Sequence, residues 1–125
     1  MNETGKIREF TDLKAWQETH QLVLEIYRAT KQFPKEELFA LTNQMRRAAV
    51  SVSANIAEGF GRQGIKEKIQ FYYISQGSLT ELKNHIFIAR DLLYLNDKVL
   101  EKIMGQAITA HRLLQGLIRK SKTFL

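Results

Sequence analysis

A chain of 125 residues with 44% hydrophobic content is long enough to bury one core, which favours a single domain. The absence of cysteine excludes disulfides, thiolate nucleophiles and cysteine-based zinc sites. A formal net charge of +6 and an isoelectric point near 9.7 favour a polyanionic partner, because each neutralised phosphate releases condensed counterions.

The first residues show no pattern of a targeting signal. Residues 1–9 are polar and mixed in charge, so we expect a loose leader there and one domain over 10–125. No apolar segment of signal-peptide type is present, and no uninterrupted apolar run of about 18 residues could span a bilayer. We therefore expect a cytoplasmic protein that does not enter the membrane.

Two helices are predicted in the first half of the chain. The first spans about 12–32, with Thr11 as its cap and Asp12 in its positive first turn. Its apolar stripe comprises Leu13, Trp16, His20, Val23, Tyr27 and Thr30. Pro34 separates it from a second helix over about 35–58, which ends where Gly59 takes the left-handed conformation. The second stripe comprises Leu38, Leu41, Met45, Ala48, Val52 and Ile56.

Two further helices are predicted after the glycine-rich turn. The third runs from about 65 to 94, and the fourth follows a cap at Asn96 or Asp97 and frays into a basic tail. The third stripe comprises Ile65, Ile69, Tyr72, Gln76, Leu79, Leu82, Ile86, Ala89 and Leu93. The fourth comprises Leu100, Ile103, Ala107, Ala110, Leu114 and Leu117.

Four amphipathic helices joined by short turns, with no alternating strand pattern, predict an all-α fold, an antiparallel up-down-up-down four-helix bundle. Small residues at Ala48, Ala49 and Gly77-Ser78 should let helices approach closely. Many apolar residues lie off the stripes, so we expect a second face to be buried in a homo-oligomer. They include Leu24, Ile26, Phe39, Phe71, Ile74, Phe87 and Ile88.

Five separated motifs carry a likeness to a known family. They are Phe10-Thr11-Asp12-Leu13 with Trp16, Phe33-Pro34, Gln44-Met45-Arg46-Arg47-Ala48-Ala49, Asn55-Ile56-Ala57-Glu58-Gly59 with Arg62, and Gly77-Ser78-Leu79 with Glu81-Leu82. In order and spacing, over about 10–95, the chain resembles the four-helix-bundle proteins encoded in bacterial 23S ribosomal RNA intervening sequences. One departure is visible after the third helix, where Leu93 stands before Tyr94 in place of a frequent glycine.

The resemblance implies the bundle fold, a ring-shaped homo-oligomer with a pentamer favoured, and an interaction with RNA or DNA. The family is similar to the accessory variability protein of diversity-generating retroelements, which binds nucleic acid and a reverse transcriptase. No activity is established for the family at large, so the resemblance implies no catalytic residue.

Three patterns that suggest chemistry have simpler structural explanations. Residues 59–64 satisfy G-x-G-x-x-G, but a dinucleotide site needs a strand before that pattern and a helix is predicted there. Glu81 and His85 are four residues apart, whereas a di-metal bundle site needs Glu-x-x-His on two helices. Ser51, Ser53 and Ser78 lack a neighbouring Asp and His pattern. We expect no catalytic residue, metal or cofactor, a hydrogen-bonded core position for His20, and a surface or interface position for His111.

Basic residues supply the candidate binding site. The turn after the second helix could present Arg62, Lys66 and Lys68 to a phosphate at the start of the third helix. Arg46 and Arg47 point about 100° apart, so at most one faces the core. The last segment has no acid after Glu101. Its candidate residues are Arg112, Arg119, Lys120 and Lys122.

A polar group near the end of the second helix has two interpretations. Asn55, Glu58 and Arg62 form either a buried polar network, with Gly59 at its turn, that fixes helix register or, less favoured, a direct ligand contact. Phe71, Tyr72 and Tyr73 are interpreted as core and interface residues and not as a base-stacking motif. The function expected overall is a non-enzymatic oligomer that binds nucleic acid. The alternative is a protein-interaction scaffold that docks a partner such as a reverse transcriptase, with its charge serving solubility or steering.

Overall fold

The computed structural model describes residues 5–125, and this part of the chain contains four α-helices and no strand. The long helices are α1 (Lys14–Thr30), α2 (Leu41–Gly61), α3 (Ile65–Asp91) and α4 (Asp97–Lys122). Two short 3-10 turns, η1 (Phe10–Asp12) and η2 (Lys35–Glu37), precede α1 and α2. The all-α prediction with four helices is therefore confirmed.

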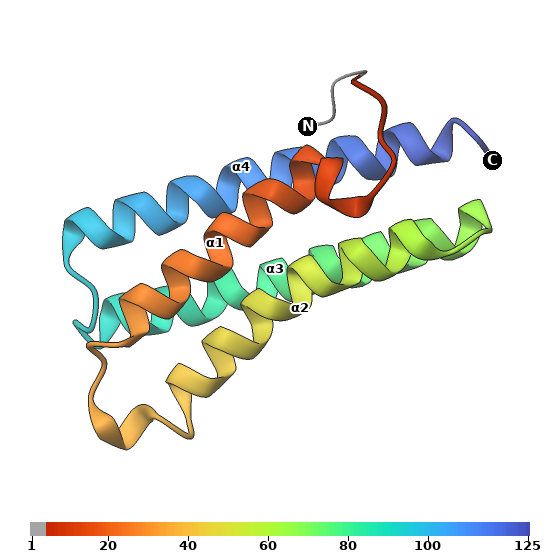
Figure 1. Cartoon of the computed structure of the whole chain (residues 1–125). Coiled ribbons are helices and arrows are strands. Elements are labelled where there is room, and N and C mark those ends of the chain that lie inside the picture. Colours follow the sequence, from red (N-terminus) through yellow and green to blue (C-terminus); the bar gives the residue numbers. More distant parts are fainter. Residues whose placement is uncertain (1–4) are drawn as a thin grey trace.

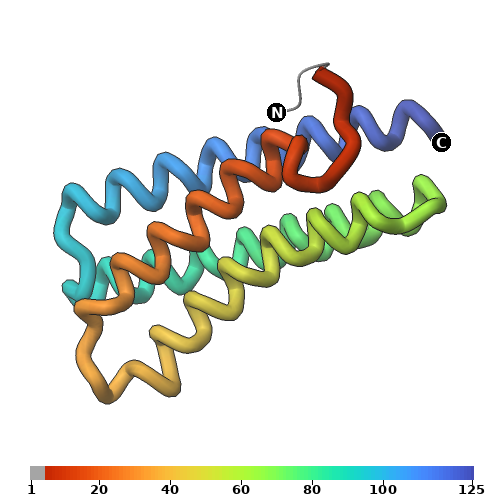
Figure 2. The backbone as a smooth tube through the Cα atoms, viewed as in Figure 1, coloured from red at the N-terminus to blue at the C-terminus, as the bar shows by residue number. Residues whose placement is uncertain are grey.

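Consecutive helices reverse direction and pack side by side (Figure 1). Helix α1 contacts α2 and α4, and α3 contacts α2 and α4, so α1 lies diagonally across from α3. The pair α2 and α3 has the most extensive contact, which Figure 2 shows as two tubes running together. The end of α4 and the N-terminal segment lie at the same end of the molecule (Figure 1). None of the helices within residues 5–125 is both long and apolar enough to cross a membrane.

The start of α1 differs from the prediction. Thr11 lies within η1 and is not a cap, and α1 begins after Leu13 without a side-chain cap. Asp12 instead accepts from the backbone N–H groups of Arg8 and Glu9, at 3.0 and 3.1 Å. Residues 1–4 of the expected leader lie outside the described residues. Asp12 thus connects the N-terminal segment to the bundle.

The buried face of α1 is shifted by one residue from the predicted stripe. The buried residues are Ala15, Thr19, Leu22, Ile26 and Thr30, whereas Trp16, His20, Val23 and Tyr27 are only partly buried or exposed. Two threonines reach the core because their hydroxyls donate within the helix: Thr19 to the Trp16 carbonyl, and Thr30 to the Ile26 carbonyl. The prediction that His20 is a core histidine is wrong, since its ring stacks on Trp16 at the edge of the core.

Helix α2 begins later than predicted. The backbone of Ala40 is not helical, with φ −123° and ψ −108°, and this interrupts the expected helix between η2 and Leu41. Leu38, predicted in the core stripe, is exposed, and Phe39 is 90% exposed. At the other end α2 continues through Gly59 to Gly61, and Gly59 has no positive φ. The prediction of a left-handed Gly59 is therefore wrong.

Helix α3 ends at Asp91, three residues before the expected end. Leu93 takes a left-handed φ of 64°, and the Tyr94 N–H donates to the Ala89 carbonyl at 2.9 Å. This is the six-to-one bond of a Schellman ending, in which glycine is the usual left-handed residue. Leu93 occupies that position here, 87% exposed, at the place where the sequence departs from the family pattern.

Helix α4 is capped as predicted, since the Asn96 side chain accepts from the Val99 N–H at 2.8 Å. The expected fraying of its basic end does not occur, because α4 stays helical to Lys122. Its buried stripe consists of Ile103, Ala107, Ala110, Leu114 and Ile118. The last buried residue is thus Ile118 and not the predicted Leu117. The core comprises a large cluster of residues from all four helices and a smaller one around Ile56, Tyr72 and Leu114.

Candidate nucleic-acid interface

The second half of α4 carries the densest group of exposed basic side chains among the predicted site residues. Arg112, Arg119, Lys120 and Lys122 are all exposed. Gly116 lies between Arg112 and Arg119 on the same side of the helix, and it leaves the backbone there without a side chain. This half of α4, residues 112–122, forms the basic segment, and a groove lies on each side of it.

The first groove lies between the N-terminal segment and α4 and has a volume of about 580 Å³. Its basic lining residues are Lys14, Arg112, Arg119 and Lys120, and its floor includes Leu13 and Leu117. The lining contains one acid, Asp12, whose carboxylate accepts two backbone N–H groups. The groove therefore presents positive charge to solvent, and Lys14 is a contributor that the sequence analysis missed.

The second groove lies between α3 and α4 and has a volume of about 410 Å³. Its lining contains no acid. The lining residues are Tyr73, Gln76, Gln115, Ile118, Arg119 and Lys122. Tyr73 is not a core residue, because Tyr72 takes the buried position and Tyr73, about 100° further round the helix, is 46% exposed. Its predicted interface position stays a prediction.

Three of the predicted binding residues are occupied with contacts inside the bundle. The Arg46 side chain donates to Thr30 Oγ1 at 2.9 Å and lies over the Tyr27 ring. Arg62 pairs with Glu58 and Glu67 and lies over the Phe71 ring. Lys68 Nζ donates to the Phe60 carbonyl near the end of α2. These cations stabilise helix ends and turns, so they are poorly placed for an incoming phosphate.

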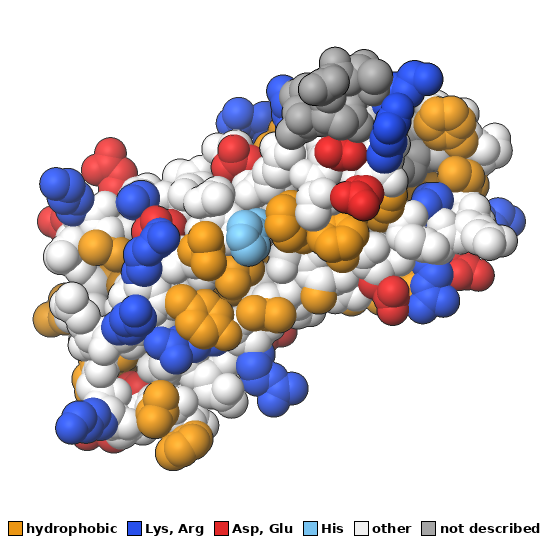
Figure 3. Space-filling model, in the orientation of Figure 1, with side chains coloured by type: hydrophobic (Ala, Val, Ile, Leu, Met, Phe, Trp, Pro, Cys, Tyr) orange, Lys and Arg blue, Asp and Glu red, His pale blue; other side chains and the backbone are white. Residues whose placement is uncertain are grey.

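The phosphate site predicted at the start of α3 is consequently not assembled. Lys66 is exposed there, but Lys68 points back towards α2 and Arg62 is neutralised by two carboxylates. Arg47 is also exposed, on the separate α1–α2 side, where it lines a groove with Arg46 and Tyr27. In Figure 3 the basic side chains on that side are spread over both ends of the face, with hydrophobic side chains between them.

The polar network predicted around Asn55 exists only in part. Asn55 Nδ2 donates to the Ser51 carbonyl at 2.8 Å, and Ser51 Oγ lies 2.8 Å from Ser78 Oγ across the α2–α3 interface. Glu58 does not join it, because its carboxylate is exposed and faces Arg62. Gly59 contributes by absence of a side chain: a Cβ there would lie 2.8 Å from the Tyr72 ring.

A hydrogen-bonded polar cluster joins α3 and α4 beside the second groove. Lys83 Nζ lies 2.7 Å from His111 Nδ1, and His111 Nε2 lies 3.2 Å from the Gln76 amide. Because a lysine ammonium only donates, His111 Nδ1 is the acceptor, and the neutral ring carries its hydrogen on Nε2. The Gln76 amide then accepts this hydrogen through its oxygen, which requires the amide group to be flipped so that its oxygen faces Nε2. Burial, and then the Lys83 charge, lower the pKa of His111, and burial lowers the pKa of Lys83. His111 is thus an interface residue between two helices.

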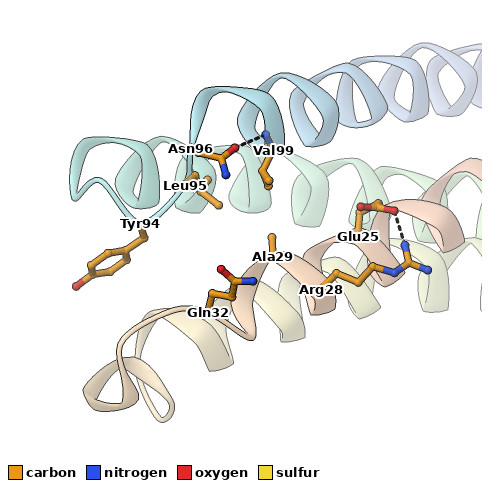
Figure 4. A pocket seen from close by; sticks show the side chains of 8 residues that line it. All are labelled: Glu25, Arg28, Ala29, Gln32, Tyr94, Leu95, Asn96 and Val99. Atoms are coloured by element: carbon orange, nitrogen blue, oxygen red, sulfur yellow. Dashed lines mark hydrogen bonds and ion pairs between the residues drawn. The ribbon is translucent and has the colours of Figure 1, made fainter.

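A third hollow lies at the opposite end of the bundle and has a volume of about 270 Å³ (Figure 4). Glu25 and Arg28 point towards each other in Figure 4 and form an ion pair, and Lys102 Nζ lies 3.3 Å from the same carboxylate. The charges of this hollow are therefore satisfied internally. Within residues 5–125, no group of three or more His, Asp or Glu side chains could hold a metal ion.

Comparison with known proteins places the fold in a family. The sequence matches the family described as 23S rRNA-intervening sequence protein over residues 11–116, which is most of the chain. Arg119, Lys120 and Lys122 lie after the matched stretch. No curated protein matches this sequence.

A solved structure has a similar fold. It is a protein of unknown function from the S23 ribosomal protein family of Bacteroides thetaiotaomicron, with a TM-score of 0.77 and 20% sequence identity. The match covers 84% of this chain and 95% of that one. At this identity the likeness concerns the fold, whereas the family match includes residues of all four helices. The chain belongs to the 23S rRNA-intervening sequence protein family.

Proposed function

We propose that this protein is a non-enzymatic, cytoplasmic bundle that binds RNA or DNA through phosphate contacts made by the basic segment. The observation that carries the proposal is the sequence of exposed cations along residues 112–122, which contain no acid, together with Lys14 across the first groove. Cations placed in a row neutralise successive phosphates and release their counterions, and this gives affinity without a sequence requirement. The family resemblance, which implies an interaction with RNA or DNA, favours the same role.

The salt dependence of binding tests this proposal. A fluorescein-labelled RNA 20-mer and the DNA of equal sequence are titrated with the protein at several KCl concentrations, and anisotropy gives the Kd. The variant Arg112→Gln/Arg119→Gln/Lys120→Gln should bind more weakly, with a shallower slope of log Kd against log salt. If each residue meets one phosphate, the slope falls by roughly 2 to 3, since each contact contributes about 0.7 to 0.9.

A matched control separates local contacts from net charge. Lys31, Lys35 and Lys98 are exposed and lie at the opposite end of the bundle, near the end of α1, in η2 and at the start of α4. Their triple change to Gln removes the same three charges and should alter the slope much less. Equal losses in both variants, or a slope near zero for the unchanged protein, would argue against the basic segment as a binding site.

We also propose that the protein is a homo-oligomer, with a ring-shaped pentamer favoured by the family resemblance. Ile74 and Ile88 are exposed apolar residues of α3, and Leu92, which is also exposed, directly follows its last residue. The spacing of 14 residues places Ile88 about 40° from Ile74 around the helix. An unpartnered apolar strip of this kind favours burial against another copy.

A protein-docking scaffold is the second candidate function. It is favoured by Phe39, 90% exposed after η2, and by Leu93, 87% exposed after α3. The two connections that carry them are joined, because the Tyr94 hydroxyl donates to Glu37 Oε2 at 2.8 Å. Co-expression with a reverse transcriptase of a diversity-generating retroelement tests docking. Phe39→Ser should reduce co-purification of the enzyme while leaving the salt-dependent RNA affinity unchanged.

A further inference from the structure

The second groove contains the three kinds of side chain that recognise an unpaired nucleotide. Tyr73 offers an exposed aromatic ring, and Gln76 and Gln115 offer amides that can both donate and accept. Arg119 and Lys122 supply two positive charges, and the buried Ile118 supplies apolar surface below them. Each of these groups has a counterpart in a nucleotide: the base face, the base edge and the phosphate.

We propose that this groove holds an unpaired base of single-stranded RNA or DNA, stacked on Tyr73, with the adjoining phosphates bound by Arg119 and Lys122. The proposal rests on the proposed function, since it names the form of nucleic acid that the basic segment receives. Stacking on an aromatic side chain tolerates any base, because every base has a π-face. The groove therefore adds a preference for single strands without a preference for sequence.

The position of Lys122 relative to Tyr73 links the base and phosphate contacts. Lys122 Nζ lies 5.1 Å from the centroid of the Tyr73 ring, within the range of a cation–π contact. The ammonium group lies over the ring face, so a base that stacks on that face takes its place and leaves it next to the adjoining phosphate. Arg119 lines both grooves, so a strand that enters the second groove also meets the cations of the first.

The amides favour a base over a plain apolar ligand. Gln76 is oriented by its contact with His111, 3.2 Å from its Nε2, and Gln115 lies on α4 facing the same groove. Amides next to an aromatic ring can pair with the exposed edge of a base. In a duplex that base is stacked between its neighbours and paired, so its face is not available to Tyr73. Duplexes should therefore gain only the phosphate contacts.

Helix α3 carries a matched control for Tyr73. Phe87 is 14 residues later, so it lies within about 40° of the same face and about 21 Å along the helix. It is 41% exposed, and the Arg90 guanidinium lies 4.8 Å from its ring centroid. That cation is neutralised, because Arg90 Nε donates to Asp91 Oδ1 at 2.8 Å. Phe87 therefore offers an exposed ring with a cation over it, as Tyr73 does, but that cation is already paired with a carboxylate and is not available to a phosphate.

The experiment compares single strands with a duplex in the full chain. Fluorescein-labelled oligo-U RNA, oligo-dT DNA and a DNA duplex of equal length are titrated with the unchanged protein, Tyr73→Leu, Tyr73→Phe and Phe87→Leu. Tyr73→Leu should weaken binding of both single strands by about 5- to 30-fold and leave duplex binding within twofold. Tyr73→Phe and Phe87→Leu should stay within twofold on every probe. The two single-stranded probes show whether the sugar matters.

Circular dichroism and light scattering confirm that each variant keeps its helices and its mass. Single-strand binding by Tyr73→Leu that is unchanged, or reduced no more than duplex binding, overturns the proposal while the phosphate-binding function stands. An equal loss in Phe87→Leu, or a loss in Tyr73→Phe, overturns the assignment of stacking to this groove. No binding of any probe by the unchanged protein at low salt contradicts the proposed function itself.

Discussion

Gly59 of α2 packs more tightly against its neighbours than any other glycine of the chain, and those neighbours are residues of α3. A Cβ at this position would lie 2.8 Å from Tyr72 Cε1 and 2.9 Å from Phe71 Cβ, distances that real Cβ atoms essentially never show. The glycine is needed for space, since its φ is not positive. Gly77 is the opposite case, because nothing lies within 4 Å of its Cβ position, so the predicted close packing at Gly77 is wrong.

The two glycines should respond oppositely to alanine. Gly59→Ala should lower the free energy of unfolding by about 1–2 kcal/mol, since overpacking outweighs the gain in helix propensity. Gly77→Ala should raise it by about 0.5–1 kcal/mol, because an exposed helix interior gains propensity without a clash. Urea unfolding at one fixed protein concentration measures both. A Gly59→Ala protein as stable as the parent would contradict the packing at this site.

At the scale of elements, arginine and lysine side chains join the helix ends. Arg46 reaches from α2 to the last turn of α1, where it donates to Thr30 and lies within 3.5 Å of the Tyr27 carbonyl. Lys68 reaches from α3 to the Phe60 carbonyl at the end of α2. Cations at helix C-termini satisfy free carbonyls and complement the helix dipole. This use removes two residues from the set of candidate phosphate ligands.

The α3–α4 interface should make stability depend on pH. Burial disfavours the charged imidazolium, and protonated His111 would also place a second cation beside Lys83, so the pKa of His111 in the folded state lies below the ordinary value of about 6.5. Above pH 6.5 His111 is neutral in both the folded and the unfolded state, so it does not make the free energy of unfolding depend on pH. As the pH falls below it, the unfolded chain takes up a proton that the folded chain does not, so the free energy of unfolding decreases until His111 protonates in the folded state.

Urea unfolding between pH 8 and 5 checks this expectation. His111→Gln should flatten the decrease below pH 6.5, because the titrating group is gone. Lys83→Met should reduce it, because one cause of the lowered pKa of His111 is removed. A decrease in His111→Gln as steep as in the parent would show that other groups produce it. The comparison is made at low salt, where charge repulsion is least screened.

For the whole molecule, the apolar strip of α3 predicts assembly. Light scattering should give a mass well above the 14.5 kDa of one chain at micromolar concentration. Ile74→Glu/Ile88→Glu should shift the mass towards the monomer, because burying two unpaired carboxylates in an interface is costly. Ile108→Glu, an equally exposed isoleucine on α4, is the control and should leave the mass unchanged. A monomeric parent protein would refute the assembly.

Much of the fold could be predicted because helix periodicity is a local property. The stripes of α3 and α4 were predicted almost throughout, from Ile69 to Ala89 and from Ile103 to Leu114. The predicted stripe of α1 contained Thr30 but missed Thr19, because Trp16 and Tyr27 are more apolar than a threonine. Both buried threonines donate their hydroxyls to helix carbonyls, which hydropathy does not register. The break at Ala40 also had no proline or glycine at the break itself to signal it.

The sequence predicted several residues of the candidate site, but it did not predict which residues lie together in space. The exposed cations of α4 were among the predicted residues, but Lys14, Gln76 and Gln115 were not, because each lies on a face whose neighbour is known only from packing. Arg46, Arg62 and Lys68 were predicted to be available and are engaged with groups 4 to 19 residues away in the chain. Apart from pairs within one helix such as Glu58 and Arg62, a sequence does not report which carbonyl or carboxylate lies within reach of a long side chain.

The sequence alone therefore determined the helical class, the four helices, the excess of positive charge and the resemblance to the family, since each follows from local spacing, composition or motif. Tertiary structure decided which cations remain available, which tyrosine of the Tyr72–Tyr73 pair faces solvent, and that Gly59 provides space between helices. The physical reason is that burial and charge neutralisation depend on neighbours from other helices. A lysine or arginine beside a free carbonyl at a helix end binds that carbonyl, whereas the same side chain facing only solvent is a candidate phosphate ligand.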